Sequence, residues 1–326
     1  MRPARALLPL AFAMALSAGH ASAQIEIKFG HTGAPGSLLS QSAELYATRA
    51  NARLGDKAKI VIYGSSQLGD DSELLQKLKL GTVDLALPSA AMSSVAPEFG
   101  VFEMPYLVRD RRHAARIADG VIRPMLAPLA EKAGYYILGV WETGFRQITN
   151  NKHPIVRPND LQGIRLRVPK GEWRAKMFHA YGADPKPMSL KTVFVALQTG
   201  AVDGQENPLS QIYAQKLQDV QTYLSLTGHV YTPAYLTAGA NFARLPPDIQ
   251  KILADTAREI EPDVLKLAAG LDENLLDKIK QSGIKVNAVD KPAFIAASKD
   301  LYGEFAKEVP AGEQLIEKCL SLANGT

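Results

Sequence analysis

Strand-like and helix-like hydrophobic patterns alternate through the first quarter of the chain. Apolar and polar side chains alternate in the strand patterns, and apolar side chains recur at helical spacing between them. The strand–helix–strand order predicts a mostly parallel sheet with right-handed crossovers, and therefore an α/β lobe. The strand patterns cover residues 25–29, 59–63 and 83–87, and the helix patterns cover 37–53 and a segment that starts at Asp70 or Asp71 and ends at Gly81.

The middle of the chain shows the same kinds of pattern after a helical stretch over residues 111–132. It predicts a second α/β lobe, and two connected lobes leave a cleft where small ligands bind. The strand patterns here cover 135–141, 145–149, 164–168, 185–188 and 201–205, and the helix patterns cover 171–181 and 190–199.

One long helical pattern runs from Pro247 to Ser282 and is interrupted only at Pro262 and Gly270. A helix of about 35 residues would be roughly 50 Å long, so we expect it to cross both lobes with a bend at Pro262. Two helices broken at Pro262 or Gly270 are the alternative. We expect the lobes to divide as 24–143 plus 232–271 for lobe I, and 144–231 plus 272–326 for lobe II.

The N-terminus is typical of a secretory signal peptide. Arg2 and Arg5 precede an apolar run over 7–16, and Ala21-Ser22-Ala23 forms a small-x-small cleavage pattern. We therefore expect residues 1–23 to be removed near Ala23 and the protein to be periplasmic. A retained anchor is the alternative, but no stop-transfer pattern follows.

Composition narrows the classes of function. Removal of 1–23 takes away two arginines and no acids, which lowers the formal net charge from +4 to +2. No basic stripe with interleaved aromatic residues is present, so we expect no nucleic-acid partner. Cys319 is the single cysteine, which excludes an intramolecular disulfide and favours a packing role. The chain is long enough to be stabilised by a large core, and we expect a monomer.

The strand pattern at 164–168 carries an arginine in an unusual place. Ile164, Leu166 and Val168 share one face, so Arg165 and Arg167 share the other. A solvated edge strand would explain both charges. Arg167, however, stands at the carboxyl end of the strand, where ligands of open α/β sheets gather, and a guanidinium there can hold a carboxylate by two parallel hydrogen bonds. The pattern therefore indicates a carboxylate receptor.

Five short motifs occur in order along the chain, and together they resemble the solute-binding proteins of tripartite ATP-independent periplasmic (TRAP) transporters, DctP-type. This resemblance implies a two-lobed periplasmic binding protein fold of the α/β class, with a cleft between the lobes and a long C-terminal helix spanning both. It also implies a periplasmic receptor that delivers a ligand to integral-membrane TRAP permease subunits. The motifs are Ser65-Ser66-Gln67-Leu68-Gly69, Met104-Pro105-Tyr106, Gly163-x-Arg165-x-Arg167-Val168-Pro169, Ala196-Leu197-Gln198-Thr199-Gly200 and Val202-Asp203-Gly204-Gln205-Glu206-Asn207-Pro208.

The resemblance implies roles for four residues. The family arginine that grips the ligand carboxylate falls on Arg167, and a second arginine found in many members falls on Arg146. The asparagine that contacts the ligand falls on Asn207, and an acidic ligand position falls on Asp71. Each has a plainer interpretation from the residues alone: Arg146 as a solvated strand residue, and Asn207 and Asp71 as helix caps.

Other positions bear on the choice of ligand. Sialic-acid-binding members carry an acidic and a basic residue where this chain has Ser89 and Met92, which argues against sialic acid. Ser89 favours a neutral, hydroxyl-compatible contact. His31, at the end of the first strand pattern, is a further candidate donor to a ligand, although a local structural role would also explain it.

A receptor and an enzyme are the competing classes. No His-Glu-x-x-His, paired-cysteine, Gly-x-Ser-x-Gly or Gly-x-Gly-x-x-Gly motif is present, so we expect no enzyme, no cofactor and no metal site. Triads are recognised by geometry, so a periplasmic enzyme acting on an organic acid stays an alternative. For the receptor we expect a small organic acid, with a sugar acid such as a uronate first and a C4-dicarboxylate or 2-oxo acid as the alternative.

Overall fold

Strand β4 (Tyr136–Asn150) connects the two halves of the molecule in the computed structural model, which describes residues 24–324. Its first half pairs with β9 (Tyr231–Ala238), and its second half pairs with β7 (Gly204–Pro208) and β8 (Tyr223–Leu226). The sequence patterns predicted two strands here. They form one strand because residues 142–145 continue the pairing with β9, across a bulge that leaves Thr143 without a partner in the register.

The first lobe contains the predicted parallel strands and their crossover helices. β1 pairs in parallel with both β2 and β3, whereas β9 and β4 close this sheet in antiparallel fashion. The predicted α/β lobe is therefore confirmed, with a mixed sheet in place of the mostly parallel one that was predicted. The new elements are β1 (Ile25–Gly30), β2 (Ala58–Tyr63), β3 (Leu85–Ala86), α1 (Leu38–Leu54) and α2 (Asp71–Leu80).

The second lobe is built around two parallel pairs of strands, β5 with β6 and β5 with β7. β7 begins at Gly204, three residues later than its pattern predicted, and it ends at Pro208, immediately before a helix. Across residues 24–324 the strand order is β2-β1-β3-β9-β4-β7-β5-β6, with β8 beside β4 and β10 beside β8. The new elements are β5 (Arg165–Val168), β6 (Asp184–Pro187), β10 (Lys285–Ala288), α5 (Glu172–Ala180), α6 (Val193–Gln198) and α7 (Leu209–Ala214).

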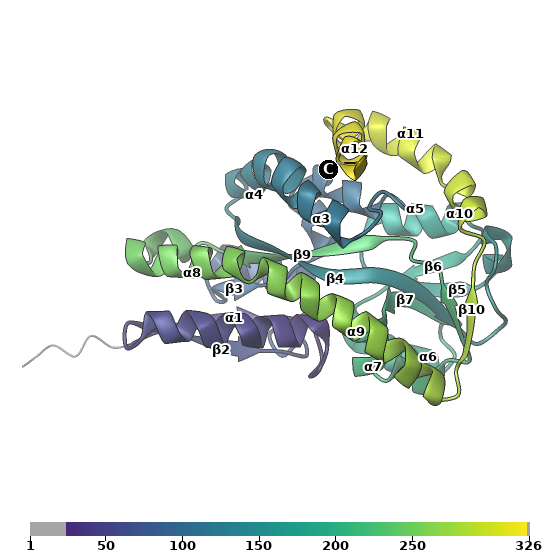
Figure 1. Ribbon diagram of the computed structural model, residues 1–326, viewed down its shortest axis with the longest axis horizontal. Coiled ribbons are helices and arrows are strands. Elements are labelled where there is room, and N and C mark those ends of the chain that lie inside the picture. The colour runs from purple at the N-terminus through teal and green to yellow at the C-terminus, as the bar shows by residue number, and fades with distance from the viewer. Residues whose placement is uncertain (1–23, 325–326) are drawn as a thin grey trace, which may run out of the picture.

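The long C-terminal helix is broken, as the alternative interpretation of its sequence held. Helix α8 (Pro247–Glu259) ends at Ile260, and α9 (Glu261–Gln281) follows with Pro262 in its first turn, where a missing N–H costs nothing. Helix α9 alone crosses both lobes (Figure 1). Its Val264 and Ala268 belong to the core of the first lobe, and Leu275 and Ile279 to that of the second.

The remaining helices pack over the upper face of the sheet in Figure 1. The predicted helix over 111–132 is continuous but contains a π-helical segment, Ala118–Leu126, with Pro124 inside it. None of the helices described between residues 24 and 324 is long and apolar enough to cross a lipid bilayer. The helices are α3 (Arg111–Ile117), α4 (Ala127–Lys132), α10 (Lys291–Ala297), α11 (Lys299–Glu308) and α12 (Gly312–Ser321), and the short 3-10 segments are Ala90–Ser94, Pro97–Glu103, Pro158–Leu161, Leu190–Thr192, Leu217–Val220, Phe242–Arg244 and Leu322–Asn324.

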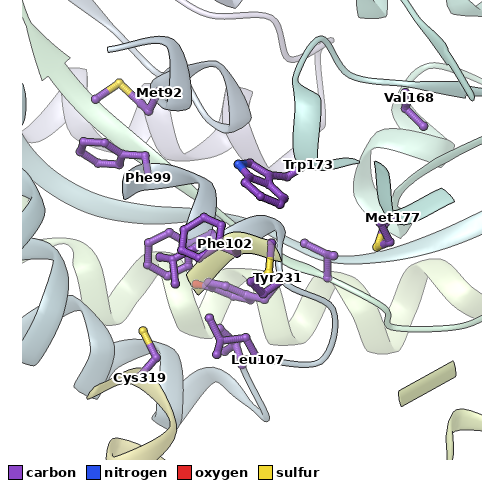
Figure 2. Packing of buried hydrophobic residues seen from close by; sticks show 14 of the residues in the cluster. Met92, Phe99, Phe102, Leu107, Val168, Trp173, Met177, Tyr231 and Cys319 are labelled. Carbon is purple, nitrogen blue, oxygen red and sulfur yellow. The ribbon is translucent and has the colours of Figure 1, made fainter. Parts of the chain in front are cut away.

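One hydrophobic core continues from one lobe to the other. Figure 2 shows part of it, with Phe99 and Phe102 of the first lobe in the same cluster as Trp173 of α5. Cys319 of α12 is fully buried in this cluster, as its predicted packing role requires, and its carbonyl is 2.8 Å from the ring of His113. Helix α12 thus packs on the first lobe, although its residues fall in the range expected for lobe II. The division into lobes at residues 143, 231 and 271 stays a prediction.

Candidate ligand-binding cleft

A cleft opens between the two lobes at the carboxyl ends of their parallel strands. It holds about 590 Å³ of empty space, part of it open to solvent. Arg167 of β5 lies opposite Gln205 of the parallel strand β7, which brings Arg167 and Asn207 to the same edge of the sheet. The lining residues are Thr32, Leu39, Asp70, Asp71, Ser72, Ser89, Ala90, Ala91 and Thr143 from the first lobe and Arg146, Arg167, Pro169, Lys170, Met188, Ser189, Leu190, Asn207 and Gln211 from the second.

Arg167 is a buried cation without a carboxylate partner. Its residue is 3% exposed, and its Nε and Nη2 donate to the backbone carbonyl of Met188 at 3.0 and 2.6 Å. No carboxylate lies within ion-pair distance of its guanidinium among residues 24–324. Burial lowers the pKa of Arg167 to about 9, because the charge is taken out of water without a counter-ion at contact distance. The site is therefore complementary to an anion.

Arg146 also lines the cleft, but its charge is balanced by Glu206. Its Nε donates to the Glu206 carboxylate, and its Nη2 donates to Glu206 Oε1 at 3.0 Å and to Asn207 Oδ1 at 3.0 Å. Its Nη1 makes no hydrogen bond within the described part of the chain. Arg146 can therefore contribute a hydrogen bond to a ligand, whereas the uncompensated charge belongs to Arg167.

Glu206 is the centre of a buried network that sequence reasoning missed. It also accepts from Arg174 Nη1 at 2.8 Å and lies 3.1 Å from His229 Nε2, and Arg174 donates to Glu103 at 2.7 Å. Burial would raise the pKa of Glu206, but the two guanidinium groups hold it well below its usual value. Burial lowers the pKa of His229 to about 4, so its ring is neutral at neutral pH.

Within the Glu206 network and the neighbouring Arg167, the buried charges leave one positive charge in excess. Three arginines, Arg146, Arg167 and Arg174, stand against two glutamates, Glu103 and Glu206, because the His229 ring is neutral. Glu206 lies within the motif at 202–208 that the sequence singled out, so it could have been suspected. Arg174 and Glu103 carried no signal, because charges on a helix and in an irregular segment are usually solvated.

The opposite wall of the cleft carries a carboxylate. Asp70 is the N-cap of α2, so Asp71 is the first helical residue. Asp70 also accepts a hydrogen bond from Lys170 Nζ at 2.9 Å. Asp71 Oδ2 accepts from the backbone N and the hydroxyl of Ser89 at 3.3 and 3.1 Å. Its Oδ1 is buried and has no partner among the residues described. Burial raises the pKa of Asp71 to about 6, against the opposing hydrogen bonds from Ser89.

Neutral polar groups also line the cleft. The amide of Asn207 accepts from Arg146 with Oδ1 and donates from Nδ2 to Gln205 Oε1 at 2.6 Å. Thr143 Oγ1 and Gln211 Oε1 are buried on the cleft wall and lack partners in the structure between residues 24 and 324. Such orphaned groups are the partners that ligand hydroxyls require.

Five of the six predicted site residues therefore line one cleft, and His31 does not. It ends β1 as expected, but its ring turns inward, makes an edge contact with Phe29 and lies against Gly64. Burial lowers the pKa of His31 to about 4. Both of its ring nitrogens are buried and lack a hydrogen-bond partner among the residues described, so a ligand contact by His31 stays a prediction.

Several other sequence expectations concern residues outside the cleft. Met92 is fully buried in the core. Arg165, which shares the strand with Arg167, is half-exposed and pairs with Asp203 at 2.8 Å, as expected of the more solvated of the two. No group of histidine, cysteine and acidic side chains in residues 24–324 has the arrangement of a metal site.

A two-lobed α/β fold with an anion-binding cleft between the lobes defines a class, the periplasmic solute-binding proteins. The family model for bacterial extracellular solute-binding protein, family 7, matches residues 29–308. The chain belongs to this family, and the resemblance to solute-binding proteins of TRAP transporters is confirmed.

Individual relatives cover nearly the whole chain. The 2,3-diketo-L-gulonate-binding periplasmic protein of Escherichia coli (strain K12) is 29% identical over 295 residues, covering 89% of this chain and 90% of the relative. The sugar acid binding protein of Advenella mimigardefordensis, solved with galactonate, is 30% identical with a TM-score of 0.88, covering 92% of this chain and 98% of that one. A TRAP solute-binding protein of Sulfurospirillum deleyianum, solved with succinate, is 31% identical with a TM-score of 0.87, covering 92% and 100%.

Proposed function

We propose that this protein is a periplasmic receptor that binds a small organic acid by its carboxylate and delivers it to a TRAP-type membrane permease. The observation that carries the proposal is the buried guanidinium of Arg167 at the cleft, which has no carboxylate partner among residues 24–324. Its free edge can form charge-assisted hydrogen bonds with a carboxylate, which would supply the missing counter-ion. Removal of residues 1–23 near Ala23 would place the receptor in the periplasm. That segment lies outside the described residues.

The charge pattern of the cleft favours a sugar acid. The ligand would find a cation at Arg167, an ionisable carboxylate at Asp71, and neutral acceptors and donors at Thr143, Gln211 and Asn207. An acid with one carboxylate and several hydroxyl groups complements this set of groups. Galactonate, bound by the Advenella mimigardefordensis relative, has this arrangement, and a uronate has it as well.

A C4-dicarboxylate or 2-oxo acid is the second candidate, because the Sulfurospirillum deleyianum relative was solved with succinate. Arg146 would be the natural partner for a second carboxylate. Its charge is already balanced by Glu206, and Asp71 would repel a second negative group. Arg146 and Asp71 therefore favour the sugar acid over the dicarboxylate. No cofactor or catalytic step is part of the proposal.

Binding would be coupled to closure of the two lobes. Lys170 and Lys191, from the second lobe, reach acids in the first turn of α2 in the first lobe: Lys170 Nζ is 2.9 Å from Asp70, and Lys191 Nζ is 3.7 Å from Glu73. These ion pairs bridge the cleft, which Lys170 and Asp70 themselves line, so they form only when the lobes are close together. A ligand held by Arg167 and Asp71 would shift the equilibrium toward this closed arrangement.

A thermal-shift screen tests the proposal. The mature protein would be heated with galactonate, galacturonate, gulonate, D-erythronate, succinate and pantoate, one acid at a time. A receptor gains thermal stability with at least one acid and leaves it chemically unchanged, which chromatography of the incubated acid would verify. Absence of a shift with every acid, or consumption of an acid, would contradict the proposal.

A further inference from the structure

A chain of buried hydrogen bonds runs from the cleft into the centre of the sheet. Asn207 Nδ2 donates to Gln205 Oε1 at 2.6 Å, Gln205 Nε2 donates to Thr149 Oγ1 at 2.9 Å, and the Thr149 hydroxyl donates to Gln221 Oε1 at 2.8 Å. Gln221 Nε2 donates to the carbonyl of Val220 at 3.0 Å. These four side chains are at most 5% exposed, and only Asn207 lines the cleft.

Both ends of this chain set its direction. Arg146 has only donors, so the Asn207 atom that it contacts must be the oxygen. At the other end a backbone carbonyl can only accept, so the Gln221 atom beside it must be the nitrogen. Reversal of the Gln205 amide would place its NH₂ against the NH₂ of Asn207 and its oxygen against Thr149. The two ends therefore agree on one arrangement of every amide between them.

The consequence reaches the ligand site. With Oδ1 held by Arg146 and one Nδ2 hydrogen held by Gln205, Asn207 has one remaining N–H, and this group belongs to a residue of the cleft wall. We infer that Gln205, Thr149 and Gln221 are positioning residues, which hold Asn207 so that it presents a hydrogen-bond donor to an oxygen of the bound acid. This inference rests on the proposed function, because it assumes that Asn207 contacts the ligand.

Thr149→Val tests the inference at a residue that does not line the cleft. Valine keeps the shape of threonine but removes the hydroxyl that accepts from Gln205 and donates to Gln221. Asn207 would therefore lose its fixed orientation. Affinity for any acid that gives a thermal shift should fall about fivefold, the equivalent of one hydrogen bond. Thr149→Ser restores the hydroxyl and should restore the affinity. Thr237→Val is the matched control, because Thr237 is equally buried in a central strand and its hydroxyl bonds only to the Tyr235 carbonyl among the residues described.

A ligand-free measurement separates this inference from the proposed function. The side-chain amide signal of Asn207 in a ¹⁵N-correlated NMR spectrum can be assigned as the one lost in Asn207→Asp. It should move in Thr149→Val, return in Thr149→Ser and stay in place in Thr237→Val. Gln221→Met interrupts the chain at its far end and should also move the signal, which provides a second variant if Thr149→Val folds poorly.

The binding measurement and the NMR measurement distinguish a failure of the proposed function from a failure of the positioning role. If no acid in the screen binds, the proposed function fails. The NMR signal still decides whether the hydrogen bonds through Gln205, Thr149 and Gln221 position Asn207. If an acid binds but its affinity and the Asn207 signal are the same in wild type, Thr149→Val and Gln221→Met, the positioning role is overturned while the receptor function stands.

Discussion

Arg167 and the backbone carbonyl of Met188 form a contact that neutralises no charge. The carbonyl accepts from both Nε and Nη2, at 3.0 and 2.6 Å, and thereby orients the guanidinium with its remaining edge toward the cleft. A carbonyl offsets part of the desolvation of the cation but supplies no counter-ion. The stability of the ligand-free protein and the affinity for an anion are therefore opposed at this one residue.

Arg167→Met should separate these two effects. It removes an unpaired buried charge, so the melting temperature of the ligand-free protein should stay the same or rise. Binding of the cognate acid should weaken by at least about 3 kcal/mol, more than a hundredfold, in calorimetry. Arg165→Met, on the same strand but half-exposed and paired with Asp203, is the control and should bind normally. Unchanged affinity in Arg167→Met would refute the assignment of the carboxylate partner.

Glu206→Gln should be among the most damaging single substitutions. It leaves Arg146 and Arg174 in a buried site with half of their counter-charge removed, and breaking a buried pair typically costs about 3–5 kcal/mol. Urea denaturation would measure the loss in the free energy of unfolding. Glu259→Gln breaks an exposed pair with Arg53 and should change stability much less. Equal effects of the two substitutions would show that the buried network is not structurally important.

Lys170→Met should weaken ligand binding modestly and make it less sensitive to salt. The lysine is 55% exposed and pairs with Asp70 across the cleft, so its loss should cost about two- to fivefold in affinity. Calorimetry at low and high ionic strength gives the salt dependence. Lys186→Met removes a surface pair within the second lobe and should leave both quantities unchanged. A salt dependence identical in wild type and Lys170→Met would argue against an ionic contribution to closure.

Asp71→Asn should change which acids bind. The carboxylate of Asp71 can accept hydroxyl hydrogens and repels a second carboxylate, so the ratio of galactonate to succinate affinity should fall about tenfold or more in the variant. Glu73→Gln, two residues further along α2 and not among the lining residues of the cleft, is the control. A ratio that does not change in Asp71→Asn would remove this residue from the determinants of specificity.

Stability should fall in mild acid because burial lowers the pKa values of three histidines, His31, His113 and His229. Their pKa values in the folded protein, about 4 for both His31 and His229, lie below the value of about 6.5 in an unfolded chain. The unfolded chain therefore binds more protons between pH 6.5 and 4. The stabilisation is complete above pH 6.5 and is lost as the pH falls through this window, by up to about 1.4 kcal/mol per pH unit for each histidine.

Asp71 acts in the opposite direction. Its folded pKa of about 6 lies above the unfolded value, so it binds its proton in the folded state over the lower part of the same window and offsets about one histidine. Urea denaturation between pH 7.5 and 4.5 should show a smaller acid loss in His31→Leu than in wild type. His153→Leu, at an exposed histidine, should follow the wild-type curve. Identical curves for wild type and His31→Leu would contradict the inward placement of this ring.

Some residues of the cleft could be predicted from the sequence, and others could not. Arg167 was predictable because a charge in an alternating strand before a proline is rare, and the same reasoning places the carboxyl ends of β5 and β7 together. His31 was placed correctly at a strand end, but hydrophobic patterns do not show whether a terminal side chain turns toward the cleft or the core. Glu206 and Arg174 compensate each other, and such a pair is visible only once tertiary structure brings the charges together.

The bulge at Thr143 determines which changes of length the chain can tolerate. This one extra residue sets the alternation of everything that follows in β4, including the face on which Arg146 lies. Deleting it would exchange the faces of Arg146 and Gln147, and would carry Thr149 away from Gln205 at the same time. Loops of this protein can gain or lose residues during evolution, but a single codon lost within 142–145 would dismantle the ligand site and its support together.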